Sequence, residues 1–273
     1  MRRYKFIIYI SILSFIACNY EKEIDYDIHF SEENIVVYAI ASPNDFYSEI
    51  FLSVSPINQE NIPEKKEFTV IILEHGNNLC TLKTNDNQKY YLPDGIKLNQ
   101  NNFYSIAVSA PGFKTVYSAD QLLPETILID TTYIQRLNSQ DYLIFRITDP
   151  QHRDNYYAYR IQYLYNGNIV DINNNYLLCF YHTFNDEGID GNEIEQKIKV
   201  SFENYSEGTK YDSLLLKVYS INEDIILLME SLEAYDATLG DPWYEKTAPI
   251  FTNITNGFGF FACYSYDSVY VKP

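Results

Sequence analysis

The sequence predicts a mainly β protein in which an N-terminal immunoglobulin- or transthyretin-like β-sandwich precedes an antiparallel β-sheet or barrel domain with one α-helix. Three observations support this. The chain contains 27 Tyr and 16 Phe, and aromatic and β-branched residues favour strands. Short apolar segments alternate with a period of two between Gly, Pro and Asn turns, as expected for β-sandwiches. Helical spacing is evident in one segment.

With 273 residues there is room for two domains of ordinary size. We expect the β-sandwich domain over 32–123 and the second domain over 124–273, with a boundary near Leu123-Pro124. The strands predicted for the sandwich are 35–40, 49–54, 68–73, 79–82, 90–92, 103–108 and 115–117. Turns such as Pro93-Asp94-Gly95 separate them.

The second half repeats this pattern with longer strands. The predicted strands are 127–130, 142–147, 156–165, 176–182, 194–202, 214–219 and a single last strand over 257–271. The turn Asn166-Gly167-Asn168 predicts a hairpin at the end of the longest strand.

A helix is predicted over 221–238. Ser220 and Glu223 have the spacing of a capping box. Apolar residues then recur at helical spacing until Gly240, which favours a core-facing stripe over a ligand site. The stripe consists of Ile225, Leu228, Met229, Leu232 and Tyr235.

The N-terminus has the pattern of an export signal over 1–17. A basic head precedes the apolar run 6–17, which is shorter than the ~20 residues of a membrane-spanning helix. Cys18 follows Ala17 directly, as in a bacterial lipobox, so we expect Cys18 to be lipidated; the alternative is an ordinary secretory signal with a chance cysteine. The acidic segment 18–31 would then be the lipidated N-terminus and its tether.

The charge excludes some partners. The formal net charge is −17, and it becomes −20 without residues 1–17, which hold three positive and no negative side chains. Such a chain repels phosphate backbones, so we expect no nucleic-acid partner. It offers no polybasic patch for an anionic membrane, so attachment would depend on the lipid.

The cysteine count argues against a disulfide scaffold. After Cys18 the sequence has Cys80, Cys179 and Cys263. At most one bridge can form, with Cys179–Cys263 as the candidate pair, and the alternative is buried free thiols.

Two ordered motifs in the second half resemble DUF4249, a family of uncharacterised Bacteroidetes lipoproteins. They comprise Asp149, Pro150, Asn155, Tyr156 and Tyr157, then Asn253, Ile254 and the run from Gly257 through Gly259 to Phe261. The resemblance covers nearly all of the chain after Cys18. It implies an outer-membrane lipoprotein, which could be exposed at the cell surface, that assists a TonB-dependent transporter in capturing a nutrient.

The same motifs also have a purely structural interpretation. Asp149 and Asn155 suit a turn at the end of a strand, because Asp and Asn bond their own backbone. Gly257 and Gly259 suit a bulge or a close backbone approach within a strand. We favour this interpretation over a binding site.

Sequence motifs for catalysis are missing. The sequence has no phosphate-binding Gly loop, nucleophile elbow or paired-histidine zinc helix, and its four histidines are scattered. The acidic loop 186–193 lacks the ligand spacing of an EF-hand, so a solvated hairpin tip is favoured over a calcium site. We expect no cofactor and no enzyme activity, although a glycosidase-type carboxylate pair is not visible in a sequence.

Aromatic loops are better candidates for binding than a carboxylate pair. Trp243 and Tyr244 lie on a loop after the helix, where their rings could contact a sugar, a peptide or a protein, but we favour a plug over the helix end. The expected anchor, the resemblance to the family and the missing catalytic motifs give the first functional hypothesis, a non-catalytic accessory subunit of a TonB-dependent transporter. The alternatives are a surface hydrolase acting on glycan or peptide, and an adhesion or surface-layer module.

Overall fold

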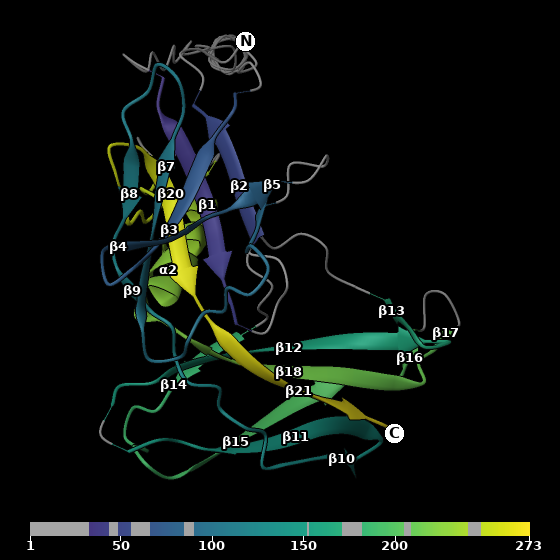
Figure 1. Ribbon diagram of the computed structural model, residues 1–273. Helices are drawn as coiled ribbons and strands as arrows, with labels where there is room; N and C mark the ends of the chain where they lie inside the picture. Colours follow the sequence, from purple (N-terminus) through teal and green to yellow (C-terminus); the bar gives the residue numbers. More distant parts are fainter. Residues whose placement is uncertain are drawn as a thin grey trace, which may run out of the picture. The chain divides into compact units, whose positions relative to one another are not determined.

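The computed structural model describes residues 33–43, 49–55, 66–84, 90–151, 153–170, 182–204, 209–239 and 247–273. The chain separates into two compact units, and the strands and helix below all belong to the unit formed by Asn34–Ser55 and Pro63–Pro273. This unit is mainly β, as predicted (Figure 1).

The first β-sandwich consists of two sheets. The smaller sheet has the order β2-β1-β20 and contains β2 (Glu49–Val54), β1 (Ile35–Ala41) and β20 (Phe258–Cys263). The larger sheet has the order β19-β8-β7-β3-β4, and β9 also pairs with β7. Its strands are β3 (Thr69–Glu74), β4 (Asn77–Thr81), β7 (Phe103–Ser109), β8 (Val116–Ser118), β9 (Gln121–Leu122) and β19 (Ile254–Thr255). The short strands β5 (Lys83–Thr84) and β6 (Tyr90–Tyr91) pair with each other.

Strand β1 is apolar on both faces. Ile35, Val37 and Ala39 point into the core between the two sheets, whereas Ile40 contributes to a second core on the opposite face, together with residues of the helix. The period of two in the sequence therefore separates two cores rather than a core from solvent.

The second half forms another pair of facing sheets. One sheet has the order β10-β11-β15, with β10 (Thr131–Leu137), β11 (Gln140–Thr148) and β15 (Glu193–Val200). The other has the order β13-β12-β18-β21, and β14 also pairs with β12. Its strands are β12 (Tyr156–Tyr165), β13 (Asn168–Val170), β14 (His182–Asn185), β18 (Ser213–Ile221) and β21 (Ser265–Val271). A separate short pair is formed by β16 (Glu203–Asn204) and β17 (Thr209–Lys210).

Apolar side chains from both of these sheets form one core, which includes Phe145 of β11 and Leu216 of β18. The antiparallel sheet that we expected is confirmed, but the barrel alternative is wrong, because the sheets among the described strands do not close. The hairpin at Asn166-Gly167 is confirmed: Tyr165 pairs with Asn168, and both turn residues have positive φ.

Two strand predictions are wrong. The segment 127–130 has no strand, although Ile127 is buried. The last strand is not continuous but divides at Tyr264 into β20 and β21, which belong to different sheets. β20 pairs in parallel with β1, so the C-terminal part of the chain returns to the first β-sandwich (Figure 1). A parallel partner from so far along the chain leaves no local signal in the sequence.

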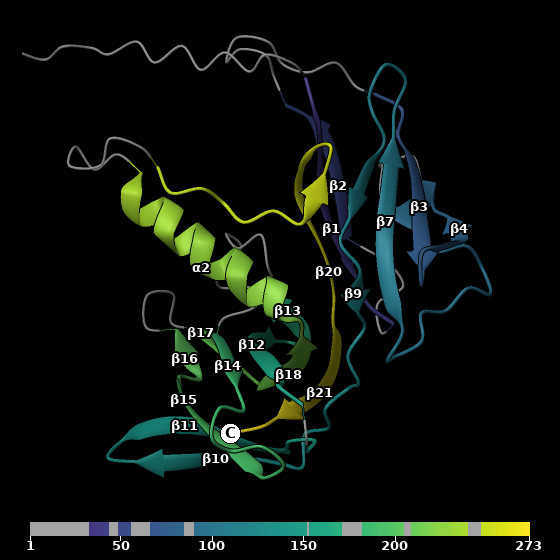
Figure 2. The ribbon, with the colours of Figure 1, turned by 90° about the vertical axis from the view of Figure 1, so that its left-hand side faces the viewer.

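The helix α2 spans Glu223–Thr238 and packs through Ile225 and Leu228, as its apolar stripe predicts (Figure 2). The predicted capping box is wrong. Asn222 is the N-cap residue and makes no side-chain cap hydrogen bond, while the Ser220 hydroxyl accepts from the Ile127 N–H at 3.3 Å. None of the described residues belongs to a helix with the length and apolarity needed to cross a membrane.

Candidate functional site

Two loops connect the sheets of the second half. The loop from Asp149 to Asn155 leads from β11 to β12, and the loop 186–192 leads from β14 back to β15. The second loop is therefore not the hairpin that we expected, because β14 pairs with β12 whereas β15 pairs with β11. Each loop crosses between the same two sheets, and the two loops lie against each other.

Reciprocal hydrogen bonds join these two loops. The Asp149 N–H donates to the Asn192 carbonyl at 3.0 Å, and the Gly191 N–H donates to Asp149 Oδ2 at 2.9 Å. At the other end the Asp186 N–H donates to the Asn155 carbonyl at 3.3 Å, and the Asn155 N–H donates to Asp186 Oδ2 at 3.1 Å. We call this arrangement the loop clasp. Asp149 and Asn155 thus satisfy backbone groups at both crossings.

The buried end of the clasp contains Tyr157. Its ring contacts Phe184 in the core at 5.3 Å between centroids, and its hydroxyl donates to Asp149 Oδ1. Burial raises the pKa of Tyr157, and the hydrogen bond to the Asp149 carboxylate and the nearby Asp186 charge raise it further. Because Asp149 is only 2% exposed, its carboxylate depends on these donors.

Three carboxylates converge at the clasp. Oxygens of Asp149, Asp186 and Asp190 lie within 4.8 Å of one another. Asp186 is buried rather than solvated, which corrects our expectation for the start of this loop. Carboxylate oxygens are the ligands that Ca²⁺ or Mg²⁺ prefers. Those of Asp149 and Asp186, however, already accept hydrogen bonds from Tyr157, Gly191 and Asn155, so their positions have a structural explanation.

A pocket of about 240 Å³ lies beside the clasp. Its lining comes from three segments: the linker after β9, the β11–β12 loop with the start of β12, and the end of β18 with the start of α2. Tyr156, Pro124 and Pro150 provide apolar surface, and Ile127 and Tyr157 are buried lining residues. Family-motif residues thus line the pocket as well as form the clasp.

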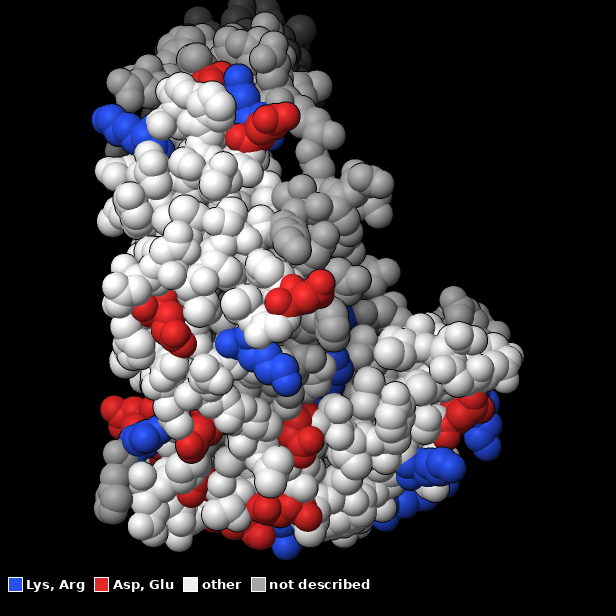
Figure 3. All heavy atoms as spheres, in the orientation of Figure 1, with Lys and Arg blue, Asp and Glu red and all other residues white. Residues whose placement is uncertain are grey.

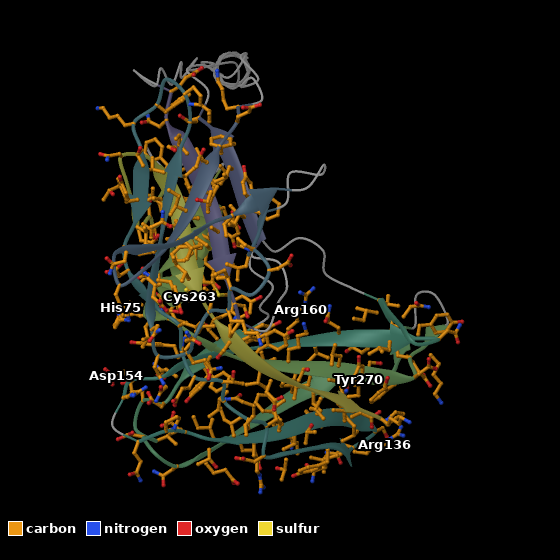
Figure 4. The ribbon with its side chains drawn as sticks, in the orientation of Figure 1. His75, Arg136, Asp154, Arg160, Cys263 and Tyr270 are labelled. Atoms are coloured by element: carbon orange, nitrogen blue, oxygen red, sulfur yellow. The ribbon has the colours of Figure 1, made fainter. Side chains whose placement is uncertain are left out.

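The charged lining of this pocket is mainly acidic. Glu125, Asp154 and Glu223 line it and are exposed, and Arg153 is the cationic residue among the described lining residues. Figure 4 labels Asp154, which lies toward the end of the second pair of sheets opposite Tyr270. Partial burial raises the pKa of Tyr156, and the negative charges of Glu223, Asp154 and Asp186 add to the effect.

Asn222 is another lining residue of this pocket. Its amide Nδ2 donates to the Leu122 carbonyl at 2.8 Å. Its Oδ1 is buried and accepts no hydrogen bond from any residue that the structure describes. A buried acceptor of this kind costs free energy until a donor reaches it.

The second family motif supports β20. Asn253 Nδ2 donates to the Phe261 carbonyl at 2.8 Å, and the Phe261 N–H donates to Asn253 Oδ1 at 2.9 Å. The side-chain amide of Asn253 thus makes the pair of hydrogen bonds that the backbone of a neighbouring strand would make. A Cβ at Gly259, which has a φ of +114°, would clash with the Val37 carbonyl oxygen. At Gly257 an added Cβ would lie 2.5 Å from the Ile35 carbonyl oxygen. These residues permit the close approach of β20 to β1.

Several predicted positions lie outside the described residues, namely the signal segment 1–17, Cys18 and its tether, residues 176–181 of the strand predicted over 176–182 (with Cys179), Trp243 and Tyr244. Cys80 and Cys263 are free thiols, and complete burial raises the pKa of Cys263. The sequence patterns did not reveal the pocket residues Glu125, Asn222 and Glu223, which come from segments about a hundred residues apart. The spacing from Ser220 suggested a capping box for Glu223, and no local motif marks Glu125.

The comparisons with known proteins agree with these motifs. The family model described as "Domain of unknown function (DUF4249)" matches residues 21–269, a range that includes the clasp, the pocket and both motifs. No curated protein matches the chain. The match extends over most of the sequence, so this chain belongs to the DUF4249 family.

Proposed function

We propose that this chain is an outer-membrane lipoprotein that acts as a non-catalytic binding subunit of a TonB-dependent nutrient transporter. The observation that carries the proposal is Cys18, which follows the apolar run 6–17 at the position of a lipidated cysteine. The family match begins at residue 21 and so does not include Cys18; the lipid anchor is therefore proposed from the N-terminal sequence alone. Two or three acyl chains on Cys18 would hold the chain stably at a membrane.

The pocket beside the loop clasp supports a binding role. It combines a half-buried aromatic ring, Tyr156, with several polar groups, as ligand sites usually do. Its volume of about 240 Å³ is below the ~300–1,000 Å³ of sites for drug-sized ligands. It therefore fits a small molecule or one group of a larger ligand.

Part of the surface also suits a protein partner. Figure 3 shows few charged side chains over the strands of the first β-sandwich. In the larger sheet of this sandwich Phe103 and Tyr117 are 42% and 46% exposed, and on the outer face of the smaller sheet Phe51 is 65% exposed. Aromatic residues of this kind are enriched in protein interfaces.

The anchor and the partner need separate experiments. Mass spectrometry of the mature chain should find acyl chains on Cys18, and Cys18→Ala should move the protein from the membrane to the soluble fraction. An affinity-tagged chain purified from detergent-solubilised outer membranes should recover a TonB-dependent transporter. An unmodified Cys18 would overturn the proposed lipid anchor, and recovery of no transporter would overturn the proposed transporter partner.

One observation favours a second candidate function, a surface hydrolase. Three carboxylates line a single pocket, those of Glu125, Asp154 and Glu223. Glycosidases use two carboxyl groups that lie ~5–10 Å apart on either side of the scissile bond. If this function is correct, the wild-type chain turns over a member of a glycan panel and Glu223→Gln lowers the rate by at least about a hundredfold. Absence of turnover by the wild type would exclude the glycosidase for that panel.

A further inference from the structure

We infer that the pocket beside the loop clasp binds an alkylammonium or guanidinium group, with the alkyl chain against Tyr156 and the cation among the carboxylates of Glu125, Asp154 and Glu223. This inference rests on the binding role proposed above and names the chemistry of the ligand. The group could come from a free amine or from a lysine or arginine side chain of a partner protein.

The distribution of charge supports a cation. Among the described lining residues, Glu125, Asp154 and Glu223 are acidic and Arg153 is cationic. Arg153 Nη1 donates to Asn101 Oδ1 at 3.3 Å, while Asn101 Nδ2 donates to Glu125 Oε1 at 2.7 Å. Asn101 thus holds both charged side chains at the rim. Asp154 and Glu223 act on the Tyr156 hydroxyl, which places two negative charges near the aromatic wall.

The uncharged lining supports an alkyl chain that ends in a cation. Tyr156, Pro124 and Pro150 offer apolar surface, and a tyrosine ring attracts a nearby cation. The lining also includes the polar side chain of Asn222, whose Nδ2 donates to the Leu122 carbonyl at 2.8 Å.

The start of α2 does not favour an anion here. A helix N-terminus carries a partial positive charge, but Glu223 and Asp224 occupy the first turn and offset it. Asp224 Oδ2 accepts from Gln121 Nε2 and from Asn253 Nδ2, each at 2.7 Å, so this carboxylate is fixed in place. Of the two acidic residues in the first turn, Glu223 therefore lines the pocket and Asp224 belongs to this hydrogen-bond network.

Three probes of equal length separate charge from hydrophobicity. The full-length chain in detergent would be titrated by calorimetry with n-pentylamine, 1-pentanol and pentanoate. We expect pentylamine to bind at least about tenfold more tightly than the other two. Each exposed charge pair contributes only modestly, but the ammonium group faces several carboxylates whose contributions add up. Equal binding of pentanol, tighter binding of pentanoate or no binding of pentylamine would overturn the inference.

Variants then locate the site. Asp154→Asn together with Glu223→Gln should weaken pentylamine binding about tenfold, whereas Glu230→Gln, on an exposed position of α2 outside the lining, should leave it unchanged. Unchanged affinity in the double variant would overturn the assignment. N-acetyl-lysine-N-methylamide distinguishes the sources: tighter binding than pentylamine indicates a protein side chain, and weaker binding indicates a free amine. These titrations need no transporter, so their failure is separate from failure of the pull-down.

Discussion

Asp149 illustrates how one buried carboxylate can organise two distant loops. Its oxygens accept from the Tyr157 hydroxyl and from the Gly191 N–H, which lie on different sides of the loop clasp. A carboxylate that is 2% exposed is costly unless donors compensate it. Here the two donors belong to parts of the chain that the fold already holds in place, so the buried carboxylate also helps to hold these parts together.

Removing this carboxylate should destabilise the protein strongly. We expect Asp149→Ala to lower the free energy of unfolding by about 3 kcal/mol, because it leaves the buried Tyr157 hydroxyl and the half-buried Gly191 N–H without an acceptor. Urea titration followed by fluorescence would measure the loss. The matched control is Asp190→Ala, at the exposed member of the same cluster, which should cost less than about 1 kcal/mol. Equal losses in the two variants would contradict this role for Asp149.

The glycine pair of β20 offers a second prediction for single residues. Gly259→Ala should destabilise the protein by more than about 3 kcal/mol, since the added Cβ meets the Val37 carbonyl oxygen and the backbone has positive φ. The control is Gly112→Ala, where φ is also positive but no heavy atom lies within 4 Å of the added Cβ. That control should cost only about 1–2 kcal/mol. Similar losses of unfolding free energy for Gly259→Ala and Gly112→Ala in denaturant titrations would contradict a destabilising effect of the close contact with Val37.

At the scale of elements, α2 connects the two halves of the described unit. Its buried side chains belong to one core together with Ile40 of β1, Phe260 of β20 and Tyr219 of β18, and Figure 2 shows the helix beside these strands. Its first turn adds the hydrogen bonds from Asp224 to Gln121 and to Asn253. The helix therefore contributes to both β-sandwiches and to one wall of the pocket.

Truncation of the buried face of α2 should show this contribution. We expect Leu228→Ala to cost about 3 kcal/mol, as cavities in well-packed cores do. Leu227→Ala, at a neighbouring position that is 38% exposed, should cost less than about 1 kcal/mol. Both values come from the midpoint of chemical denaturation at constant slope. Equal costs for the two leucines would indicate that α2 is not anchored by this face.

For the whole molecule, the decisive feature is the return of β20 to the first β-sandwich. β20 pairs with β1 from Val36–Phe258 to Ala41–Cys263, and β19 pairs with β8. The chain thus completes its first sandwich only after the second half is made. The predicted boundary near Leu123-Pro124 stays a prediction, but these pairings imply that the range 32–123 lacks two strands of its own sheets.

A fragment test follows from this topology. The fragment 34–123 should not unfold cooperatively when heated, because one edge of β1 and one edge of β8 lose their partners. Fusing residues 250–264 to it through a flexible linker should restore a cooperative transition and dispersed amide signals. The same fusion with Gly259→Val should not restore them. Cooperative unfolding of 34–123 alone would refute the dependence on β20.

Local sequence signals identified many of the individual elements, although not β10. Alternating apolar residues marked β1, β7, β12 and β18, and the Asn166-Gly167 pair marked its hairpin, because side-chain period and turn chemistry act over a few residues. The apolar stripe marked α2. For the motif residues from Asp149 to Tyr157 the sequence favoured a structural role over a binding site; in the structure Asp149 and Asn155 take part in the clasp, and Tyr156 lines the pocket.

The sequence by itself thus determined a β-rich chain with one amphipathic helix, an acidic surface and the membership signals of its family. Only the tertiary structure decided that the strand expected over 257–271 divides between two sheets, and that Glu125, Asp154 and Glu223 share one pocket. The physical reason is that strand pairing and carboxylate proximity depend on distances in space between residues far apart in the chain, and local propensity carries no record of those distances.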